Sequence, residues 1–323
     1  MTKVKNYVGV DVSKKTLDIA IPKEDGSYLH KKISNDSAGF KSLLKFLPAE
    51  SCLVMEATSS YYMPFAYYLQ AHQIAVCIVN PLSVNHFAKM RMSRAKTDKK
   101  DAAMIAQYGK SETPRLWKPK AAHLLELQQM QAILDNLTKQ KTSYSNQMEA
   151  FVSSGQMSAS VKKIVEEQME HCVKEIAKLD EAMQDIIQEH HADLFKELQT
   201  IPGLGKRTAL LLIVITEGFT KFEKSKELVS YVGICPRLYE SGTSVKGKSR
   251  ICKMGMSRMR QLLYLCGMRA MTANKQCKEM YERLKAKGKN GKLIIVAIAS
   301  KLLRQAFAVG VGKKSYNPNF SLN

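Results

Sequence analysis

Four acidic side chains in the first third of this 323-residue chain have the types and spacing of a metal-dependent phosphoryl-transfer site. Asp11 lies in the short apolar run YVGVDV, and Glu56 lies near the end of a second run, CLVMEA. Asp98 and Asp101 are three residues apart in AKTDKKDAAMIAQY. Carboxylate oxygens are ligands that Mg²⁺ prefers, and two ions about 4 Å apart can activate a nucleophile and stabilise a leaving oxygen. We therefore expect these acids to bind Mg²⁺ in a two-metal type of site.

The elements around these acids are expected to bring them together. Residues 7–12 and 51–56 read as buried strands, and 17–22 with 28–34 read as a hairpin around the turn 24–26. If the strands at 7–12 and 51–56 are neighbours, Asp11 and Glu56 emerge at the same edge of the sheet. Thr97 is an expected N-cap, which places Asp98 and Asp101 on one face of the first helical turn. Each acid alone also suits a turn or a helix start, so the prediction depends on their combination.

The order of elements predicts an α/β fold followed by helices. Strands come first as a meander and then alternate with helices, which indicates a mixed sheet covered by helices. Residues 121–197 contain no proline and a single glycine, Gly155, and their apolar residues recur at three- and four-residue steps. This predicts two long helices with a coiled-coil-like seam. The alternatives are a spacer that also oligomerises and an ordinary hairpin packed on its own chain.

Residues 198–323 read as a mostly helical, basic domain, with the stretch 241–255 as an exposed loop or short hairpin. The expected organisation is therefore a catalytic domain over 1–115, a helical spacer over 116–197 and a C-terminal domain over 198–323.

Basic residues are concentrated in the C-terminal part of the chain. The sequence has 50 Lys and Arg against 29 Asp and Glu, a net charge of +21. From residue 200 onward there are 24 Lys and Arg against six acids, all of them Glu. Basic side chains neutralise phosphates and release condensed counterions, so this asymmetry favours a nucleic-acid partner. A generally basic protein without such a partner is the alternative that composition leaves open.

The order of these motifs is similar to that of a known enzyme family. A strand with GVDVSK, a hairpin, an acid at the end of a later strand and a DxxD helix follow one another as in RNase H-like, RuvC-like nucleases. With IPGLGKRTA and YESGTSVKGKSRICKMG further on, the sequence resembles the DEDD transposases of bacterial insertion sequences in the IS one-ten family over nearly its whole length. Those enzymes are recombinases guided by a bridge RNA.

The resemblance implies partners and a further catalytic residue. The partners are target and donor double-stranded DNA, a guide RNA and further copies of the chain in a dimer or tetramer. Ser241, in YESGTS, would attack a DNA phosphodiester and hold the strand covalently. No histidine follows His191, so this part of the chain has no imidazole to activate the serine. Lys246, Lys248 and Arg250 instead supply positive charge that can bind the phosphate and stabilise its transition state. Ser-Gly-Thr-Ser is also ordinary turn chemistry, and Ser244 is a competing nucleophile that residue types alone do not exclude.

Two further basic segments are candidate nucleic-acid contacts. Gly203, Gly205 and Lys206 lie in IPGLGKRTA, which has the Gly-x-Gly turn of a helix-hairpin-helix that binds phosphate through backbone N–H groups. A tight turn between packed helices would have the same pattern. Lys253 and Arg258 extend the basic track after Arg250. A Walker phosphate loop, GxxxxGK[ST], does not occur in the sequence, so ATP use is not expected.

The sequence thus predicts a transposase or DNA recombinase that is cytoplasmic, nucleoid-associated and not membrane-bound. Seven scattered cysteines without a CxxC pair indicate reduced thiols, and uncharged apolar runs stay well below the roughly 18 residues of a membrane span. One alternative is a hydrolytic, RuvC-like junction-resolving nuclease in which water attacks and Ser241 is a turn residue. The other is a nucleic-acid-binding protein without catalysis.

Overall fold

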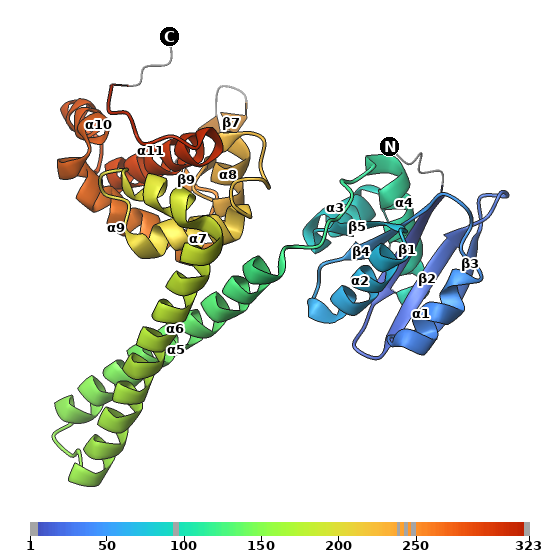
Figure 1. Ribbon diagram of the computed structural model, residues 1–323, viewed down its shortest axis with the longest axis horizontal. Helices are drawn as coiled ribbons and strands as arrows, with labels where there is room; N and C mark the ends of the chain where they lie inside the picture. The colour runs from blue at the N-terminus through green and yellow to red at the C-terminus, as the bar shows by residue number, and fades with distance from the viewer. Residues whose placement is uncertain (1–5, 93–96, 238–239, 242–244, 247–249, 320–323) are drawn as a thin grey trace. The chain divides into compact units, whose positions relative to one another are not determined.

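The computed structural model describes residues 6–92, 97–237, 240–241, 245–246 and 250–319, with the backbone alone at 240–241 and 245–246. The chain divides into two compact units, Met1–Pro119 (unit 1) and Lys120–Asn323 (unit 2), each with a hydrophobic core of its own (Figure 1).

Unit 1 is built on a mixed five-stranded sheet in the order β3-β2-β1-β4-β5. β1 (Asn6–Val12), β2 (Thr16–Pro22) and β3 (Tyr28–Ser34) form an antiparallel meander, whereas β4 (Ser51–Glu56) and β5 (Ala75–Val79) run parallel to β1. The β2–β3 turn is fixed locally, because the Asp25 carboxylate accepts a hydrogen bond from Ser27 N at 2.8 Å and Gly26 adopts a φ of +82°. The expected meander and buried fourth strand are both present.

Helices cover both faces of this sheet. α1 (Ser37–Leu44), the 3₁₀ turn η1 (Ser60–Tyr62) and α2 (Met63–Ala71) pack with one face, while α3 (Pro81–Met90) and α4 (Asp98–Glu112) pack with the other. Alternate residues of a strand point to opposite faces, so Leu53 and Met55 join the α1–α2 side and Cys52 and Val54 join the α3–α4 side. The mixed, helix-covered sheet expected from the sequence is confirmed.

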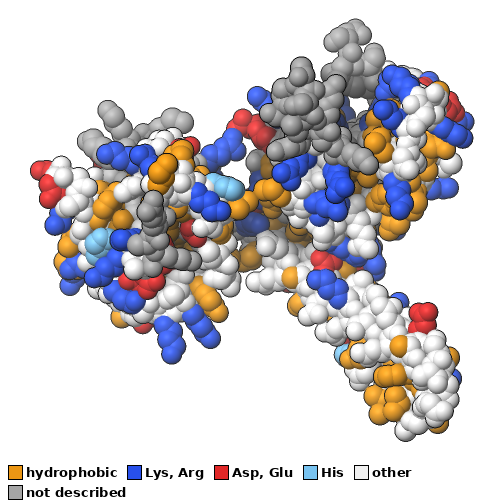
Figure 2. Space-filling view, turned by 180° about the vertical axis from the view of Figure 1, so that it is seen from behind, with side chains coloured by type: hydrophobic (Ala, Val, Ile, Leu, Met, Phe, Trp, Pro, Cys, Tyr) orange, Lys and Arg blue, Asp and Glu red, His pale blue; other side chains and the backbone are white. Residues whose placement is uncertain are grey.

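Unit 2 begins with a helical hairpin of α5 (Ala122–Ser153) and α6 (Ala159–Gln199), whose turn contains Gly155 with a φ of +67°. Part of the expected seam is buried between or beneath these helices, including Leu127, Leu134 and Met183. Other seam residues are exposed, among them Ile164 at 57%. Hydrophobic side chains are visible toward the far end of the hairpin in Figure 2, where Val152 is 60% exposed.

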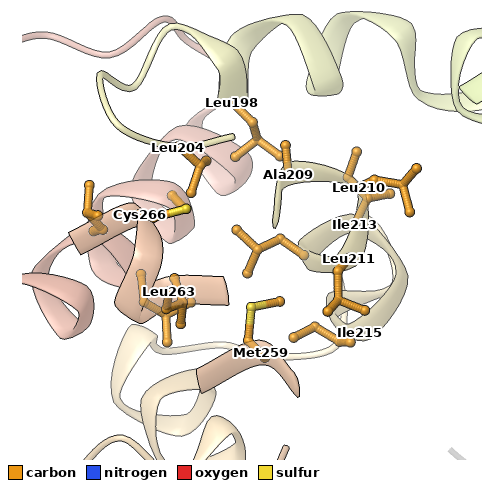
Figure 3. Packing of buried hydrophobic residues seen from close by; sticks show 14 of the residues in the cluster. Leu198, Leu204, Ala209, Leu210, Leu211, Ile213, Ile215, Met259, Leu263 and Cys266 are labelled. Carbon is orange, nitrogen blue, oxygen red and sulfur yellow. The ribbon is translucent and has the colours of Figure 1, made fainter. Parts of the chain in front are cut away.

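The base of the hairpin packs into the core formed by α7 (Lys206–Thr216), α8 (Ser225–Val232), α9 (Ser257–Ala273), α10 (Lys275–Ala286) and α11 (Gly291–Gly312). Side chains of α7 such as Leu211 pack with Met259 and Leu263 of α9 (Figure 3). α11 is long and apolar enough to cross a membrane, but half of its apolar stretch is buried and it packs against α6, α8, α9 and α10. It is therefore placed as a core helix of unit 2.

The segment between α8 and α9 contains two short antiparallel strand pairs. β6 (Pro236–Arg237) pairs with β9 (Arg250–Ile251), and β7 (Glu240–Ser241) pairs with β8 (Val245–Lys246). Two glycines at the start and end of this segment allow close approach of its backbone. A Cβ on Gly233 would lie 2.3 Å from Met254 O, and one on Gly255, whose φ is +136°, would lie 2.3 Å from Tyr231 O. The short hairpin expected in this stretch is present.

Candidate active site

Asp11 and Glu56 lie at the ends of two neighbouring parallel strands. β1 and β4 pair with Val10 opposite Met55, so each acid is the next residue on its strand. Both side chains are partly exposed there. The pairing of β1 with β4 meets the condition stated from the sequence and brings these two acids to one edge of the sheet.

α4 brings the other two acids to β1. The Thr97 hydroxyl caps the helix by accepting a hydrogen bond from Lys100 N at 3.3 Å, and Asp98 and Asp101 both lie in the first turn. α4 packs against β1 and β2 at very short range, because Gly9 has no side chain. A Cβ at Gly9 would lie only 1.9 Å from Ala102 O. This close approach places the first turn of α4 beside Asp11.

The carboxylates interact electrostatically. The pKa of Asp11 is raised, first by burial of its carboxyl group and then by the negative charges of Asp101, Asp98 and Asp18. A backbone hydrogen bond from Val12 opposes this rise without cancelling it. Asp98 and Asp101 of α4 therefore lie close enough to Asp11 for their carboxylates to repel one another. Protonation of Asp11 or a bound cation would relieve this repulsion.

Asp18 and Lys32 are members of this cluster that the sequence did not reveal. Asp18 lies directly opposite Asp11 in the β1–β2 register and is only 8% exposed. Lys32 of β3 forms ion pairs with acids of two different elements. Its Nζ lies 3.1 Å from Asp18 Oδ2 of β2 and 3.8 Å from Asp98 Oδ2 of α4. The signal for Asp18 was present in LDIAI, where it is the one charged residue in a strand with buried neighbours on each side.

The residue types in this cluster fit a hard divalent cation. The candidate donors are carboxylate oxygens of β1, β4 and α4, and a bound cation would relieve the repulsion of Asp11 by Asp98 and Asp101. Among the described residues, no group of three or more His, Cys, Asp or Glu side chains is arranged to hold a metal ion. The ammonium of Lys32 lies between Asp18 and Asp98, where it supplies positive charge to one side of the cluster.

In unit 2, the backbone of Ser241 lies on β7, paired with Val245. Ser244 and Lys248 lie outside the described residues, as do the side chains of Ser241 and Lys246. Arg250 and Lys253 follow on β9 and the loop after it, and both line a groove of about 930 Å³. Its apolar floor includes Ile251 and Val296, and its basic lining also includes Arg283, Lys292, Lys301 and Arg304. This groove combines apolar surface with a concentration of positive charge beside the Ser241 hairpin.

Comparisons with known proteins decide the family. A model for DEDD transposases of the IS110 type, described as a transposase, matches residues 8–155, and one described as the transposase IS116/IS110/IS902 family matches residues 195–282. Pilin gene-inverting proteins of Moraxella bovis and Moraxella lacunata are each 31% identical over 317 residues, which cover 94% of this chain and 95% of theirs. The chain belongs to the IS110 family of transposases. The transposase for insertion sequence element IS1111A of Coxiella burnetii is 25% identical over 292 residues, covering 82% of this chain and 77% of that protein.

The two matched regions of this IS110-family transposase contain all the candidate site residues. The first includes the four acids together with Asp18 and Lys32, and the second includes Ser241 and the basic residues around it. Family membership identifies a DNA-processing enzyme whose substrate is DNA.

The remaining predicted nucleic-acid residues of the transposase have different surroundings. Gly203, with a φ of +95°, packs on α9, where a Cβ would lie 2.8 Å from Ala270 Cβ, whereas Gly205 has open space around it. Lys206 is exposed at the start of α7. Arg258 is mostly buried, and its Nε lies 3.1 Å from Asp135 Oδ1. Gly205 and Lys206 therefore present a surface at the N-terminus of α7, while Arg258 is engaged inside unit 2.

Proposed function

We propose that this transposase is an RNA-guided, Mg²⁺-dependent DNA recombinase that cleaves and exchanges strands through a covalent phosphoserine intermediate. The observation that carries the proposal is the convergence of Asp98 and Asp101 on Asp11, at the strand edge shared with Glu56. The strand order of unit 1, with a three-stranded meander continued by two parallel strands, suits an RNase H-like, RuvC-like catalytic domain.

In the proposed reaction the Ser241 hydroxyl attacks a DNA phosphorus atom. A bond forms between Oγ and phosphorus, the bond to one bridging sugar oxygen breaks, and the hydroxyl proton ends on that leaving oxygen. Mg²⁺ held by Asp11, Glu56, Asp98 and Asp101 would lower the pKa of the attacking hydroxyl and stabilise the leaving oxygen. Attack on the phosphoserine by the hydroxyl of a second DNA strand then restores the serine and joins the exchanged strands.

Ser241 belongs to unit 2 and the four acids belong to unit 1. The proposed reaction therefore requires the two parts to meet, within one chain or between copies in a dimer or tetramer. Lys246, Lys248 and Arg250 would hold the phosphate under attack, because positive charge stabilises the charge that develops in the transition state.

DNA and a guide RNA are the proposed partners. The basic groove that contains Arg250 and Lys253 offers positive charge for a sugar–phosphate backbone, and Gly205 with Lys206 offers a helix N-terminus for a phosphate. The two Moraxella relatives are named for inverting a pilin gene, which requires strand exchange. This favours recombination over simple hydrolysis for the present chain.

The test uses purified protein, labelled double-stranded target DNA, Mg²⁺ and the non-coding RNA that flanks the gene, analysed on denaturing gels with and without protease. We expect a protease-sensitive protein–DNA adduct that requires RNA and Mg²⁺. Ser241→Ala should abolish the adduct, whereas Ser244→Ala should retain it. Asp11→Asn should abolish cleavage because it removes a charged metal ligand.

Other results would select the alternatives. Free nicked ends without any adduct, still formed by Ser241→Ala, would show that water is the nucleophile and that the protein is a hydrolytic nuclease. DNA binding that is unchanged by Asp11→Asn, with no cleavage under any condition, would contradict catalysis altogether. An adduct that forms equally well without RNA would contradict RNA guidance alone.

A further inference from the structure

Three histidines of unit 2 form a cluster to which the proposed recombination assigns no task. His123 lies near the start of α5, and His190 and His191 are consecutive residues near the end of α6. The Nε2 atoms of His123 and His191 are 3.0 Å apart. The ring of His190 stacks on that of His123, with centroids 4.1 Å apart and an interplanar angle of 18°.

A local break in α6 creates this arrangement. Consecutive residues of a regular helix point about 100° apart, so two of them do not normally reach the same partner. At His191 the backbone leaves the helical region, with a φ of −143° and a ψ of 25°. Both imidazoles can consequently contact His123. On the other side, Gly218, whose φ is +65°, leaves room for the His191 ring, since a Cβ there would lie 3.3 Å from His191 Cε1.

The two facing imidazoles are joined by a hydrogen bond between their Nε2 atoms, so one ring presents the lone pair of its Nε2 to the other. Glu217 precedes Gly218 in the chain, and Lys120 and Lys221 pair with its carboxylate at 3.4 and 3.9 Å. Neutral imidazole is the form of histidine that binds metals.

The spacing of the two nitrogens suits one metal ion. With metal–nitrogen bonds of about 2.0–2.1 Å, two ligating nitrogens lie about 2.9 Å apart at a right angle and about 3.3 Å apart at the tetrahedral angle. The observed Nε2–Nε2 separation of 3.0 Å falls between these values. We propose that His123 and His191 form a two-imidazole site for a divalent transition-metal ion of the Zn²⁺ class, with water completing the coordination.

The surroundings define what kind of site this would be. His190 Nε2 lies 3.8 Å from Glu189 Oε1, so this third imidazole is turned to a carboxylate of its own helix while its ring packs on His123. Across the described parts of the chain, no three His, Cys, Asp or Glu side chains are placed to hold a metal ion together, so His123 and His191 would be the two protein ligands. The site is thus open rather than closed, and its nitrogen donors favour Zn²⁺, Ni²⁺ or Co²⁺ over the Mg²⁺ proposed for the carboxylates.

The experiment is a titration of the EDTA-treated full-length chain, freed of chelator, with Zn²⁺ by calorimetry and with Co²⁺ by visible absorption, in the presence of excess Mg²⁺. We expect one ion per chain at this site and a cobalt spectrum that reports nitrogen coordination. His123→Ala and His191→Ala should each weaken binding by about tenfold or more, since even partners of metal ligands contribute that much. His171→Ala is the matched control, because His171 is an exposed residue on the same helix. It should leave binding unchanged.

His190→Ala tests whether His190 binds the metal or only packs on His123. It should reduce metal binding less than His123→Ala and His191→Ala do. Circular dichroism of every variant shows whether unit 2 is still folded, and His191→Gln offers a milder change if the alanine variant unfolds. The proposal is overturned if no ion binds in the presence of Mg²⁺. It is equally overturned if His171→Ala weakens binding as much as His123→Ala, or if folded His123→Ala and His191→Gln bind like the wild type.

Discussion

The contact between Gly9 and α4 offers a sharp test of how the carboxylate cluster is assembled. In Gly9→Ala the new Cβ would lie 1.9 Å from Ala102 O and 2.4 Å from Ala106 N. Both are backbone atoms of α4, so no side-chain rotation relieves the overlap. The helix must move away from β1, and the first turn with Asp98 and Asp101 moves with it. One methyl group should therefore impair both the stability of unit 1 and its site.

Overpacking of a core costs about 1–3 kcal/mol, and the upper half of that range is expected here because the atoms met belong to the backbone. Trp117 makes the measurement specific to unit 1. It is the single tryptophan of the chain, packs against the unit 1 core and meets the Tyr67 ring edge-on at 5.3 Å. With a urea dependence of roughly 1–3 kcal/mol per molar, a loss of about 2–3 kcal/mol should lower the midpoint of its fluorescence transition by about 0.7–3 M.

Gly109→Ala is the control on the same helix. Its Cβ would meet side-chain atoms, Val54 Cγ2 at 2.6 Å and Tyr7 Cδ1 at 3.0 Å, which can adjust. We expect a loss of about 1 kcal/mol for this variant. Displacement of catalytic groups by about 1 Å can lower a rate on the order of 10²-fold, so Gly9→Ala should also cleave DNA far more slowly than Gly109→Ala. Equal stability and equal cleavage in the two variants would refute the reasoning.

Three further perturbations test separate parts of the structure. Thr97→Ala removes the N-cap of α4 and should lower the free energy of unfolding of unit 1 by about 1 kcal/mol. Asp36→Ala removes the N-cap of α1 and should cost about the same. Only Thr97→Ala should also weaken Mg²⁺-dependent cleavage. The pKa of Asp11 is higher in folded unit 1 than in the unfolded chain. At a pH above the folded-state pKa, the charged carboxylate therefore lowers the free energy of unfolding of unit 1. This loss disappears as the pH falls through the folded-state pKa and the carboxylate is protonated. Asp11→Asn should therefore raise the urea midpoint of Trp117 fluorescence at neutral pH, with the gain shrinking in acid. Arg258→Ala breaks the mostly buried pair with Asp135 and should lower the free energy of unfolding of unit 2 by about 1 kcal/mol, measured by circular dichroism.

Local signals were sufficient to predict most of unit 1. The meander, the turn at Gly26 and the N-cap at Thr97 each depend on residues a few positions apart, and each is present. The joint position of Asp11 and Glu56 also followed, because parallel neighbours end at the same edge of a sheet. What these acids do chemically stays a prediction until cleavage is measured.

Features that depend on contacts between distant segments were not predictable in this way. Asp18 faces Asp11 only because of the β1–β2 register, and Lys32 reaches Asp98 only because α4 lies across the sheet. The apolar repeat of residues 121–197 predicted a coiled-coil-like seam, but two residues of that repeat, Ile164 and Val173, are exposed, at 57% and 47%. A repeat of three and four residues identifies an apolar stripe without saying how much of it a neighbouring helix covers.

The same contacts that build the carboxylate cluster also make it unfavourable on its own. Burial raises the pKa of Asp11, and Asp101 and Asp98 raise it further because Gly9 lets α4 approach β1 closely. Lys32 pairs with Asp18 and Asp98, and its charge also acts on Asp11, so it offsets part of this repulsion. A cation bound among Asp11, Asp98 and Asp101 would remove the repulsion that remains, and it would bind the folded unit in preference to the unfolded chain. Mg²⁺ should accordingly stabilise unit 1 by an amount that rises with the logarithm of its concentration above the dissociation constant. Asp11→Asn should reduce that stabilisation, because the repulsion and the metal affinity arise from the same charges.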